Sequence, residues 1–568
     1  MERDRILEQI QANPEVDVLV IGGGINGIGT FRDLALQGVS VLLVERGDFG
    51  SGASAASSHM LHGGIRYLEN GEFRLVREAL TERNLMLKNA PHYARPLPTT
   101  IPIFSWTSGF LNAPLKFLQL RDKPSERGAA VIKIGLILYD IFARRYRVMP
   151  THSFDLRKKS LELYPKLNPE IVCTATYYDA WMPYPERLCL ELVLDTETAS
   201  DQAHALNYAS AIDSSGDTVT LRDELTEQTL TVRPRIVVNA AGPWIDFANG
   251  RLGKPTRLIG GTKGSHLILD HPELYEATAG HEMFFENDDG RIVLILPYLG
   301  KVMIGTTDIR IDNPDEAYCT DEEVAYMLDL VKKVFPSITV DRSQIIYKFS
   351  GVRPLPSSDE SFTGNVSRDH HISTLEPDEK LPFPVFSLIG GKWTTFRAFS
   401  EQATDRVLER LNRPRRQTTE NLAIGGGRNF PTDQRAWEQW IQQVSDLHNI
   451  DRTRVRVLLE RYGTRAEAII QYIAAGEDAP IPGLDDYSQR EILFLANFER
   501  VERLDDLLLR RTLIGWMGQL TAAALREIAQ IAAEALEWDE ARVQQEIERT
   551  TQLLTQRHGV NLSRISPV

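Results

Sequence analysis

The sequence predicts an α/β protein that carries an additional all-helical domain at its C-terminal end. Over residues 16–50 a strand, a glycine-rich turn, a helix and a second strand follow one another. Strand-like runs recur over about 170–350, and beyond about 415 apolar residues recur at helical spacing. We therefore expect a Rossmann-like dinucleotide domain, an inserted and mainly antiparallel β-sheet substrate domain, and a C-terminal helical domain.

The bulk properties narrow the class of protein. A chain of 568 residues is too long for one core and predicts two to four domains. A formal net charge of -14 argues against a general nucleic-acid binder. The three cysteines show no metal-ligand spacing, which fits a reducing cytosol. We expect neither a signal peptide nor a membrane-spanning helix.

The expected domains are interleaved along the chain. Residues 16–75, about 170–250 and 350–410 are predicted to form a discontinuous cofactor domain. Segments of about 76–169 and 250–350 are predicted to build the sheet domain, and residues 415–568 the helical domain. Composition and apolar spacing change at about 415, which is why the boundary is drawn there.

The glycine-rich turn matches the G-x-G-x-x-G pattern. Gly22, Gly24 and Gly27 directly follow the apolar run Val18–Ile21, and a helix comes next. The glycines allow a tight turn and close approach of a pyrophosphate, which sits at the positive end of the helix. Glu45 ends the second strand, where an acid holds a ribose hydroxyl and disfavours a 2′-phosphate. The alternative is a glycine-rich turn that binds no ligand.

The pattern alone does not separate NAD from FAD, but two features favour FAD. The Gly/Ser-rich loop RGDFGSGASAASS follows Glu45 in place of a second regular α/β half. A strand–Gly–Gly–helix unit also recurs at Leu388–Lys392, as if it closed over the far end of a long cofactor. Ser57 and Ser58 are then expected to contact the flavin or the pyrophosphate.

A small set of polar residues stands at glycine turns and strand ends, where side chains can be aimed at a site. Its four cations come from well-separated segments and would together favour a phosphate monoester. Each arginine alone is better explained as a surface salt bridge, but the glycine settings favour a site for the set. The set is Arg66, Tyr67, His266, Thr306, Asp308, Arg353, Arg368 and Lys392.

Histidines raise two further questions of chemistry. His266 either makes a hydrogen bond in the core or takes a proton from an alcohol, a role that suits an imidazole. His59 and His62 lack a third ligand nearby, so we expect no metal site. The serine-rich loop lacks a nucleophile elbow, which argues against hydrolysis.

Several motifs in order resemble those of the FAD-dependent glycerol-3-phosphate dehydrogenases. They are VIGGGINGIG, HGGIRYLE, NAAGPW, KGSH, IGTTD, SGVRPL, SRD and GGKWTTFR, and they cover about residues 16–400. The resemblance implies a fold like those of glutathione reductase and the amino-acid oxidases. It also implies that FAD oxidises glycerol 3-phosphate at C2 to dihydroxyacetone phosphate, with electrons passing to membrane quinone or, in related oxidases, to oxygen.

The resemblance assigns roles to individual residues. Arg353 and His266 would lie at the reacting hydroxyl, and which of them takes the proton stays open. The residues expected to bind the phosphate are Arg66, Tyr67, Thr306, Arg368 and Lys392. The residues expected to bind FAD are Gly22, Gly24, Gly27, Glu45, Ser57, Ser58, Gly242 and Gly391.

Two further features are a departure from the family's pattern and a candidate membrane-contacting segment. His59 stands where the family often has Lys, so it is expected to be a flavin-proximal or structural contact. The basic amphipathic stretch 131–147 resembles the family's membrane-contacting region and implies attachment to one leaflet, at the inner face of the cell membrane. The alternative for this stretch is a buried helix with a solvated basic end. A homodimer and the role of the C-terminal helices are left open.

Other functions remain as alternatives. An oxidase of the same substrate, or an amine or 2-hydroxy-acid oxidase on the same fold, would use oxygen as electron acceptor. A flavin-loaded redox sensor or membrane scaffold would bind FAD without oxidising any small alcohol.

Overall fold

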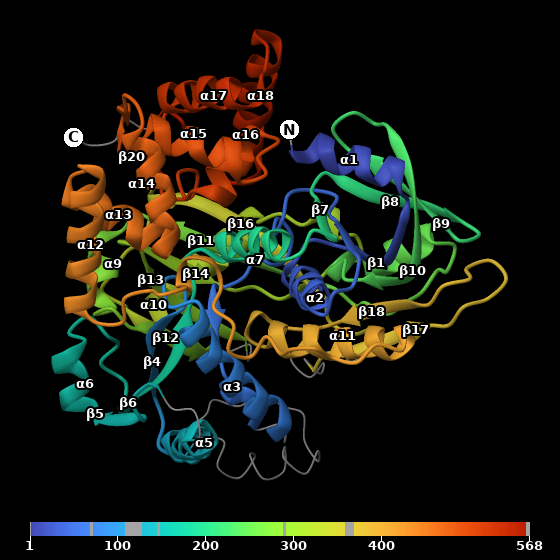
Figure 1. Cartoon of the computed structure of the whole chain (residues 1–568). Coiled ribbons are helices and arrows are strands. Elements are labelled where there is room, and N and C mark those ends of the chain that lie inside the picture. The colour runs from blue at the N-terminus through green and yellow to red at the C-terminus, as the bar shows by residue number, and fades with distance from the viewer. Residues whose placement is uncertain are drawn as a thin grey trace.

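The protein is described here from a computed structural model that covers residues 2–68, 72–107, 128–144, 148–287, 291–357 and 369–563. The side chains of Glu2, Arg66 and Leu68 lie outside this description. Two large β-sheets form the centre, and helices surround them (Figure 1). The C-terminal helices lie at the top and upper left of Figure 1, and helix α5 (Ala129–Ala143) lies at the bottom.

The first sheet carries the glycine turn. Its order is β17-β18-β10-β1-β2-β7, and β1 pairs in parallel with both β10 and β2. An antiparallel hairpin, β8–β9, extends from β10. The strands are β1 (Glu15–Ile21), β2 (Val41–Val44), β7 (Ala203–Leu206), β8 (Ala209–Ser215), β9 (Thr218–Asp223), β10 (Thr229–Asn239), β17 (His371–Leu375) and β18 (Val385–Ile389).

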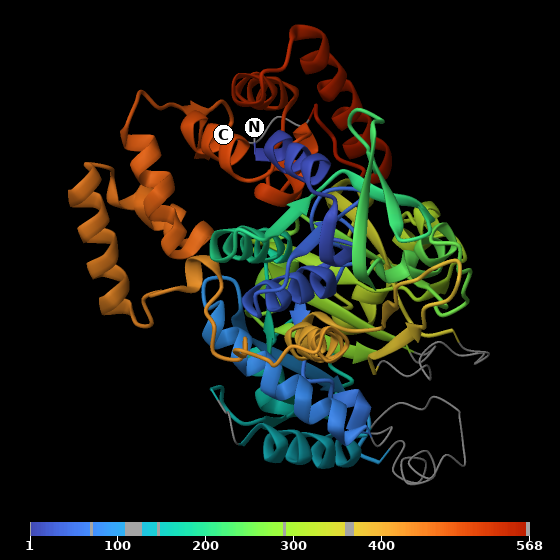
Figure 2. The same cartoon turned by 45° about the vertical axis from the view of Figure 1, so that its right-hand side comes forward.

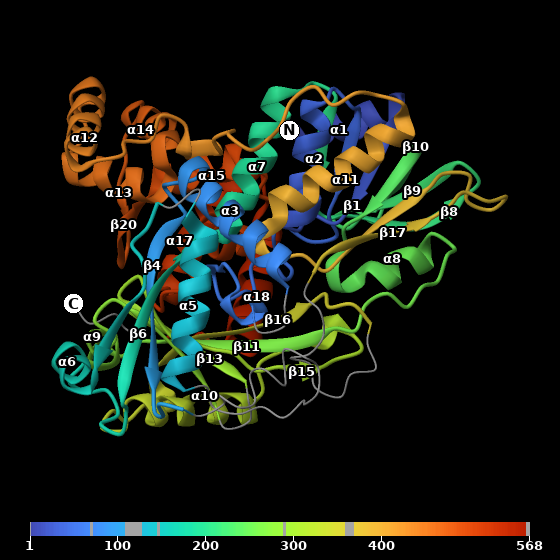
Figure 3. The ribbon, with the colours of Figure 1, turned by 90° about the horizontal axis from the view of Figure 1, so that it is seen from below.

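Both faces of this sheet are covered, which explains the continuous apolar runs of its central strands. Val18 and Val20 face a core built with helices α2, α7 and α11, which Figure 3 shows together on one side of β1. Leu19 and Ile21 face the opposite way, toward α1 and the β8–β9 hairpin. The helices are α1 (Glu2–Ala12), α2 (Ile25–Leu36), α7 (Pro185–Ala199), α8 (Ile245–Arg251) and α11 (Phe396–Leu411).

The second sheet is antiparallel except between β12 and β4, which confirms the predicted mainly antiparallel sheet. Its order is β15-β11-β14-β13-β12-β4-β6-β3, with β16 on β11 and β5 on β6. The strands are β3 (Met60–Leu61), β4 (Arg95–Ile103), β5 (Ser153–Leu156), β6 (Cys173–Trp181), β11 (Thr262–Leu269), β12 (Glu282–Glu286), β13 (Ile292–Tyr298), β14 (Lys301–Gly305), β15 (Ile309–Arg310) and β16 (Ile345–Arg353).

Strands β3 and β6 correct the ranges predicted for the first domain. Both fall within ranges that the sequence predicts for the cofactor domain, yet both belong to the second sheet. Strand β6 pairs with β4 over its whole length, from Cys173 opposite Ile103 to Trp181 opposite Arg95. Non-local pairing decides the sheet to which a strand belongs, and position along the chain does not reveal it.

Helices cover the second sheet on both faces. One face packs against α9 (Pro272–Ala277) and α10 (Asp321–Val334), and α3 (Phe73–Asn89) and α5 pack near β4 and β6. The other face shares a core with the C-terminal helices. These are α12 (Gln434–His448), α13 (Arg452–Tyr462), α14 (Ala466–Ala474), α15 (Gln489–Phe498), α16 (Leu504–Asp506), α17 (Ala522–Leu536) and α18 (Glu540–Gln552).

The C-terminal region is mainly helical, as predicted, but contains one short hairpin, β19 (Pro480–Ile481) with β20 (Leu484–Ser488). It is also joined to the first domain by buried ion pairs. Asp48 accepts hydrogen bonds from Arg510 at 2.6 Å and from Arg511 at 2.5 Å, and all three side chains are buried. Figure 2 shows the red helices lying above the strands of the first sheet. The C-terminal region therefore contacts the second sheet and a connection of the first.

Helix α5 exposes one apolar face. Ile134, Ile137 and Ile141 are 55%, 43% and 57% exposed and recur at the spacing of one helix side. Tyr139 and Leu136 on the opposite side are buried against α3 and β6. Across the described ranges, no helix combines the length and the apolar character needed to cross a bilayer. Residues 145–147 of the predicted basic stretch lie outside the described residues.

Candidate active site

The glycine turn between β1 and α2 is shaped as the sequence predicts. Gly22 has a φ of +110°, a conformation that side chains disfavour. A Cβ atom at Gly27 would overlap with the carbonyl oxygen of Gly22, so the third glycine allows the helix to approach the strand. Ser54 Oγ accepts a hydrogen bond from the backbone N–H of Ile25 at 2.9 Å. The first turn of α2 is thus held close to the Gly/Ser-rich loop.

Glu45 closes the other side of this turn. Its carboxylate accepts hydrogen bonds from the backbone N–H of Gly23 at 2.6 Å and of Gly47 at 2.8 Å. Burial raises the pKa of this carboxyl, while these two hydrogen bonds act in the opposite direction. The acid predicted at the end of β2 therefore lies at the glycine turn.

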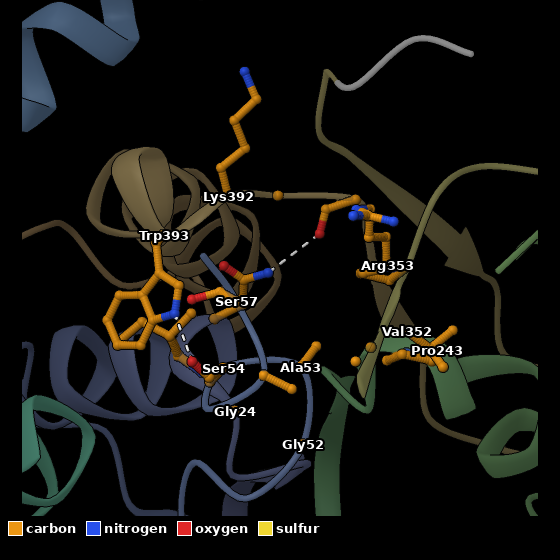
Figure 4. Close-up of a pocket in the computed structure, with 18 of the residues that line it drawn as sticks. Gly24, Gly52, Ala53, Ser54, Ser57, Pro243, Val352, Arg353, Lys392 and Trp393 are labelled. Atoms are coloured by element: carbon orange, nitrogen blue, oxygen red, sulfur yellow. Dashed lines mark hydrogen bonds between the residues drawn. The ribbon is translucent and has the colours of Figure 1, made fainter. Parts of the chain in front are cut away.

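One cavity of about 640 Å³ contacts the glycine turn and continues to the second sheet. This volume lies in the range of roughly 300–1,000 Å³ that is usual for ligand pockets. Figure 4 shows Ser54, Ser57 and Trp393 on one side of it, and Pro243, Val352 and Arg353 on the other. Its lining includes Gly22, Gly24, Glu45, Ser57, Ser58, Tyr67, Gly242, His266, Thr306, Arg353, Gly391 and Lys392.

The second glycine unit, after β18, faces the first. Gly391 has a φ of +93°, and a Cβ there would lie 2.6 Å from the side-chain nitrogen of Asn26. The side chain of Asn26 donates to the carbonyl oxygen of Gly390 at 3.3 Å. Trp393 Nε1 donates to the carbonyl oxygen of Ser54 at 2.9 Å. The unit at Leu388–Lys392 therefore returns to the cofactor loop, as the sequence suggested.

His266 lies at the junction of the two sheets. It projects from β11 toward the cavity, and its Nε2 lies 2.8 Å from the hydroxyl oxygen of Ser58. Its ring stacks on Phe349 with centroids 4.8 Å apart. Burial, together with the positive charge of Arg353, holds the pKa of His266 well below its ordinary value. The imidazole is therefore neutral at physiological pH.

Arg353 ends strand β16 and is held by the turn after β14. Nη1 donates to Asp308 Oδ1 at 3.1 Å, and Nη2 donates to Thr306 Oγ1 at 3.1 Å and to the carbonyl oxygen of Thr307 at 3.3 Å. A Cβ at Gly264 would overlap with the guanidinium group, which therefore lies against β11. The structure thus brings Arg353, Thr306 and His266 to one wall of the cavity.

Lys392 and Tyr67 form a second polar group on the same cavity. The Lys392 ammonium lies 3.6 Å from the centroid of the Tyr67 ring. Tyr67 belongs to the short helix η1 (Ile65–Leu68), and Thr394 Oγ1 donates to the carbonyl oxygen of His62 at 3.1 Å, linking the two segments. The side chain of Arg66 and the whole of Arg368, both predicted to bind phosphate, lie outside the described residues.

A buried carboxylate behind this loop was not predicted. Asp179 Oδ1 on β6 accepts from the backbone N–H of Gly63 at 2.9 Å, from Arg83 at 2.9 Å and from the Tyr139 hydroxyl at 2.5 Å. The HGGIRY segment is therefore anchored to the second sheet and to helix α5. The available signal was an acid within the otherwise buried run TATYYDAW, but its partners are distant in sequence.

His59 and His62 differ in their surroundings. His62 lines the cavity, whereas His59 is buried among Tyr298, Phe349 and Trp516. Burial lowers the pKa of His59 to about 4, so it is uncharged where a lysine would carry a charge. The described residues contain no cluster of three or more His, Cys, Asp or Glu side chains that could hold a metal ion.

The rim of the cavity carries a further contact that was not predicted. Arg46 pairs with Asp315 at 2.8 Å, and Trp244 Nε1 donates to the same carboxylate at 3.0 Å. Arg46 follows β2 and Trp244 follows β10, and both strands belong to the first sheet. Asp315 lies in η4 (Pro314–Glu316), which follows β15 of the second sheet. This contact joins the two halves of the protein beside the glycine turn.

A mainly parallel sheet with a glycine turn, joined by one cavity to a mainly antiparallel sheet, is typical of dinucleotide-dependent oxidoreductases. Residues 17–374 match the family described as FAD dependent oxidoreductase, and residues 417–543 match the C-terminal domain of alpha-glycerophosphate oxidase. The chain belongs to the family of FAD-dependent glycerol-3-phosphate dehydrogenases.

Two curated relatives and one solved structure are similar to this chain. A glycerol-3-phosphate dehydrogenase of Synechocystis is 33% identical over 96% of this chain and 97% of its own. A D-erythritol 1-phosphate dehydrogenase of Brucella abortus is 32% identical over 88% of this chain and 95% of its own. The crystal structure of a glycerol-3-phosphate dehydrogenase from Bacillus halodurans with FAD superposes with a TM-score of 0.75, at 24% identity, over 100% of this chain and 99% of the other. This last likeness supports the fold.

Proposed function

We propose that this enzyme oxidises sn-glycerol 3-phosphate at C2 to dihydroxyacetone phosphate, and that the electrons pass from FAD to a membrane quinone. The observation that carries this proposal is the cavity of about 640 Å³ that joins the glycine turn to a neutral histidine and to two separate cationic groups. The names of relatives at 33% and 32% identity support a polyol phosphate as substrate.

The residues present fit FAD. Gly22 and Gly24 line the cavity at the positive end of α2, where the pyrophosphate would lie. Glu45 would accept hydrogen bonds from ribose hydroxyls. Ser57, Ser58, Gly242 and Gly391 line the cavity beyond the turn and would contact the remainder of the cofactor.

The phosphate of the substrate would bind at the Lys392 group. Lys392 supplies a point charge, and Tyr67 holds its position through the ring contact at 3.6 Å. Arg66 and Arg368 are proposed as further phosphate ligands on sequence grounds. Thr306 was expected here, but its hydroxyl contacts Arg353 at 3.1 Å, so we assign it to the reacting end of the substrate.

The chemistry at C2 requires a hydride acceptor, a base and a cation. FAD, when bound, would supply the hydride acceptor at N5 of its flavin. His266 takes the hydroxyl proton at Nε2, because arginine does not deprotonate in proteins. Arg353 faces the oxygen and stabilises the negative charge that develops on it. Of the two residues that the sequence left open as the base, we therefore propose His266.

We also propose peripheral attachment to the cytoplasmic face of the cell membrane. The apolar face of α5, with Ile134, Ile137 and Ile141 exposed, fits insertion into one leaflet. Ile137→Glu should reduce co-sedimentation with anionic lipid vesicles. Leu447→Glu serves as the control, because Leu447 is 69% exposed on helix α12 of a different domain.

The activity is tested by product formation. Purified enzyme is given glycerol 3-phosphate with a short-chain quinone, and dihydroxyacetone phosphate and hydrogen peroxide are both measured in air. We expect product in step with quinone reduction and little peroxide. Peroxide in step with product would identify an oxidase, and product from glycerol or lactate at equal rates would refute phosphate recognition.

A further inference from the structure

A buried carboxylate lies on the face of β11 that points away from the cavity. Side chains alternate along a strand, so Gly264 and His266 face the cavity while Lys263 and Ser265 face helix α10. There Ser265 and Lys263 meet Glu323, which comes from the first turn of α10 and is 3% exposed. Glu323 is not among the site residues that the sequence predicts.

Glu323 accepts four hydrogen bonds and is thereby fixed in one position. Oε1 accepts from Thr307 Oγ1 at 2.6 Å and from Ser265 Oγ at 2.9 Å. Oε2 accepts from Lys263 Nζ and from the backbone N–H of Thr320, at 2.8 Å and 2.9 Å. A carboxylate with this many donors stays ionised, and its pKa is lowered by Lys263 and Thr307 against the effect of burial.

Thr307 connects this carboxylate to the reacting end of the cavity. Its hydroxyl donates to Glu323 and accepts from the backbone N–H of Ser265 at 2.9 Å. Thr307 itself is 1% exposed, and its neighbours Thr306 and Asp308 hold the guanidinium of Arg353. The carbonyl oxygen of Thr307 accepts from the same guanidinium at 3.3 Å.

We propose that Glu323 is a positioning residue for the reaction: through Thr307 it fixes the turn at 306–308, and this turn holds Arg353 over the reacting oxygen. The proposal rests on the proposed function for the role of Arg353. It also gives a reason for the buried ion pair between Lys263 and Glu323, because apolar residues of similar volume would often stabilise the fold equally well at such a place. Misplacement of a catalytic group by about 1 Å costs on the order of 100-fold in rate.

The first test compares two substitutions of Thr307. Thr307→Val keeps the shape and removes the hydroxyl, whereas Thr307→Ser keeps the hydroxyl. We expect the rate of flavin reduction at saturating substrate to fall by about tenfold or more in Thr307→Val and to change little in Thr307→Ser. Glu323→Gln should resemble Thr307→Val, and Glu322→Gln, an exposed neighbour on the same turn, should resemble wild type.

A double substitution separates positioning from general damage. In an Arg353→Lys background Thr307→Val should add less than about twofold, because the group that it positions is already changed. If the rate losses of the two single variants multiply fully in the double variant, the proposal is overturned. Equal rates in Thr307→Val and Thr307→Ser would overturn it as well.

A substrate-independent measurement keeps this inference distinct from the proposed function. Phenylglyoxal modifies accessible arginines, and mass spectrometry follows Arg353 in the FAD-bound enzyme. We expect faster modification of Arg353 in Thr307→Val and Glu323→Gln than in Thr307→Ser and Glu322→Gln. Unchanged modification would refute the positioning role even where glycerol 3-phosphate reduces the flavin. Failure of that reduction in wild type would count against the proposed function alone.

Discussion

The hydroxyl oxygen of Ser58 lies 2.8 Å from Nε2 of His266, although the two residues are 208 positions apart. Ser58 ends the Gly/Ser-rich loop that follows β2 of the first sheet, and His266 lies on β11 of the second sheet. This contact places a neutral imidazole where the two halves of the cavity meet. A cofactor held by the first sheet would therefore meet the reacting end of a substrate at His266.

The depressed pKa of His266 predicts an unusual pH profile. A base must be deprotonated to act, and a histidine with the ordinary pKa of about 6.5 would lose activity below that pH. Because burial and Arg353 lower the pKa of His266, we expect kcat/KM to stay level as pH falls from 8 to 6. His266→Gln should slow flavin reduction by about 10²–10⁴-fold. A wild-type midpoint near 6.5 that disappears in His266→Gln would contradict this.

Lys392→Gln tests the phosphate site. Loss of a charged hydrogen-bonding partner costs roughly 1.5–3 kcal/mol, which corresponds to a rise in KM of about 10- to 150-fold. The saturated rate should change far less, because the phosphate does not react. Lys380→Gln is the control, since Lys380 is exposed in the connection before β18. A fall in kcat at constant KM would remove Lys392 from the phosphate site.

Asp315→Asn tests the contact at the rim. Arg46 and Asp315 are 45% and 52% exposed, and exposed pairs contribute about 0.2–1 kcal/mol. We expect FAD to dissociate up to about fivefold faster, with the difference shrinking at high salt. Flavin fluorescence on dilution measures this rate. Asp312→Asn is the matched control, and equal rates in both variants would show that the rim contact does not retain FAD.

Glu282 predicts a pH dependence of stability. Its side chain is 0% exposed and burial raises its pKa to about 8, against 4.5 in the unfolded chain. Between these values the folded protein holds a proton that the unfolded chain has released, so the free energy of unfolding falls by about 1.4 kcal/mol per pH unit as pH rises. Glu282→Gln mimics the protonated acid, so its free energy of unfolding should not show this fall with rising pH.

The stabilisation by Glu282→Gln should therefore grow between pH 5 and pH 8 in urea unfolding. Glu276→Gln, on the exposed side of α9, should show no such trend. A pH-independent difference between Glu282→Gln and wild type would mean that Glu282 is ionised in the folded protein.

The local parts of the site could be predicted from the sequence, whereas its supports could not. Short sequence motifs mark three parts of the site. These parts are the turn at Gly22–Gly27, the unit at Gly390–Gly391 and His266. The contact between Thr306 and Arg353 shows the limit of this reasoning, because the two residues lie on separate segments and no local pattern pairs them. Glu323 does have a local signature, because Thr320 and Glu323 have the spacing of a helix capping box. The hydrogen bonds from Gly63 to Asp179 and from Thr307 to Glu323 come from distant parts of the chain, and no local pattern predicts them.

The central claim, that FAD in this cavity oxidises a polyol phosphate, is tested most directly by an anaerobic titration. The FAD-loaded enzyme is mixed without acceptor with glycerol 3-phosphate, D-erythritol 1-phosphate, glycerol or lactate, and the flavin absorbance is followed. We expect glycerol 3-phosphate to bleach the flavin completely and at the highest rate, and glycerol and lactate to leave it oxidised. Bleaching by all four compounds, or by none, would contradict the proposed function.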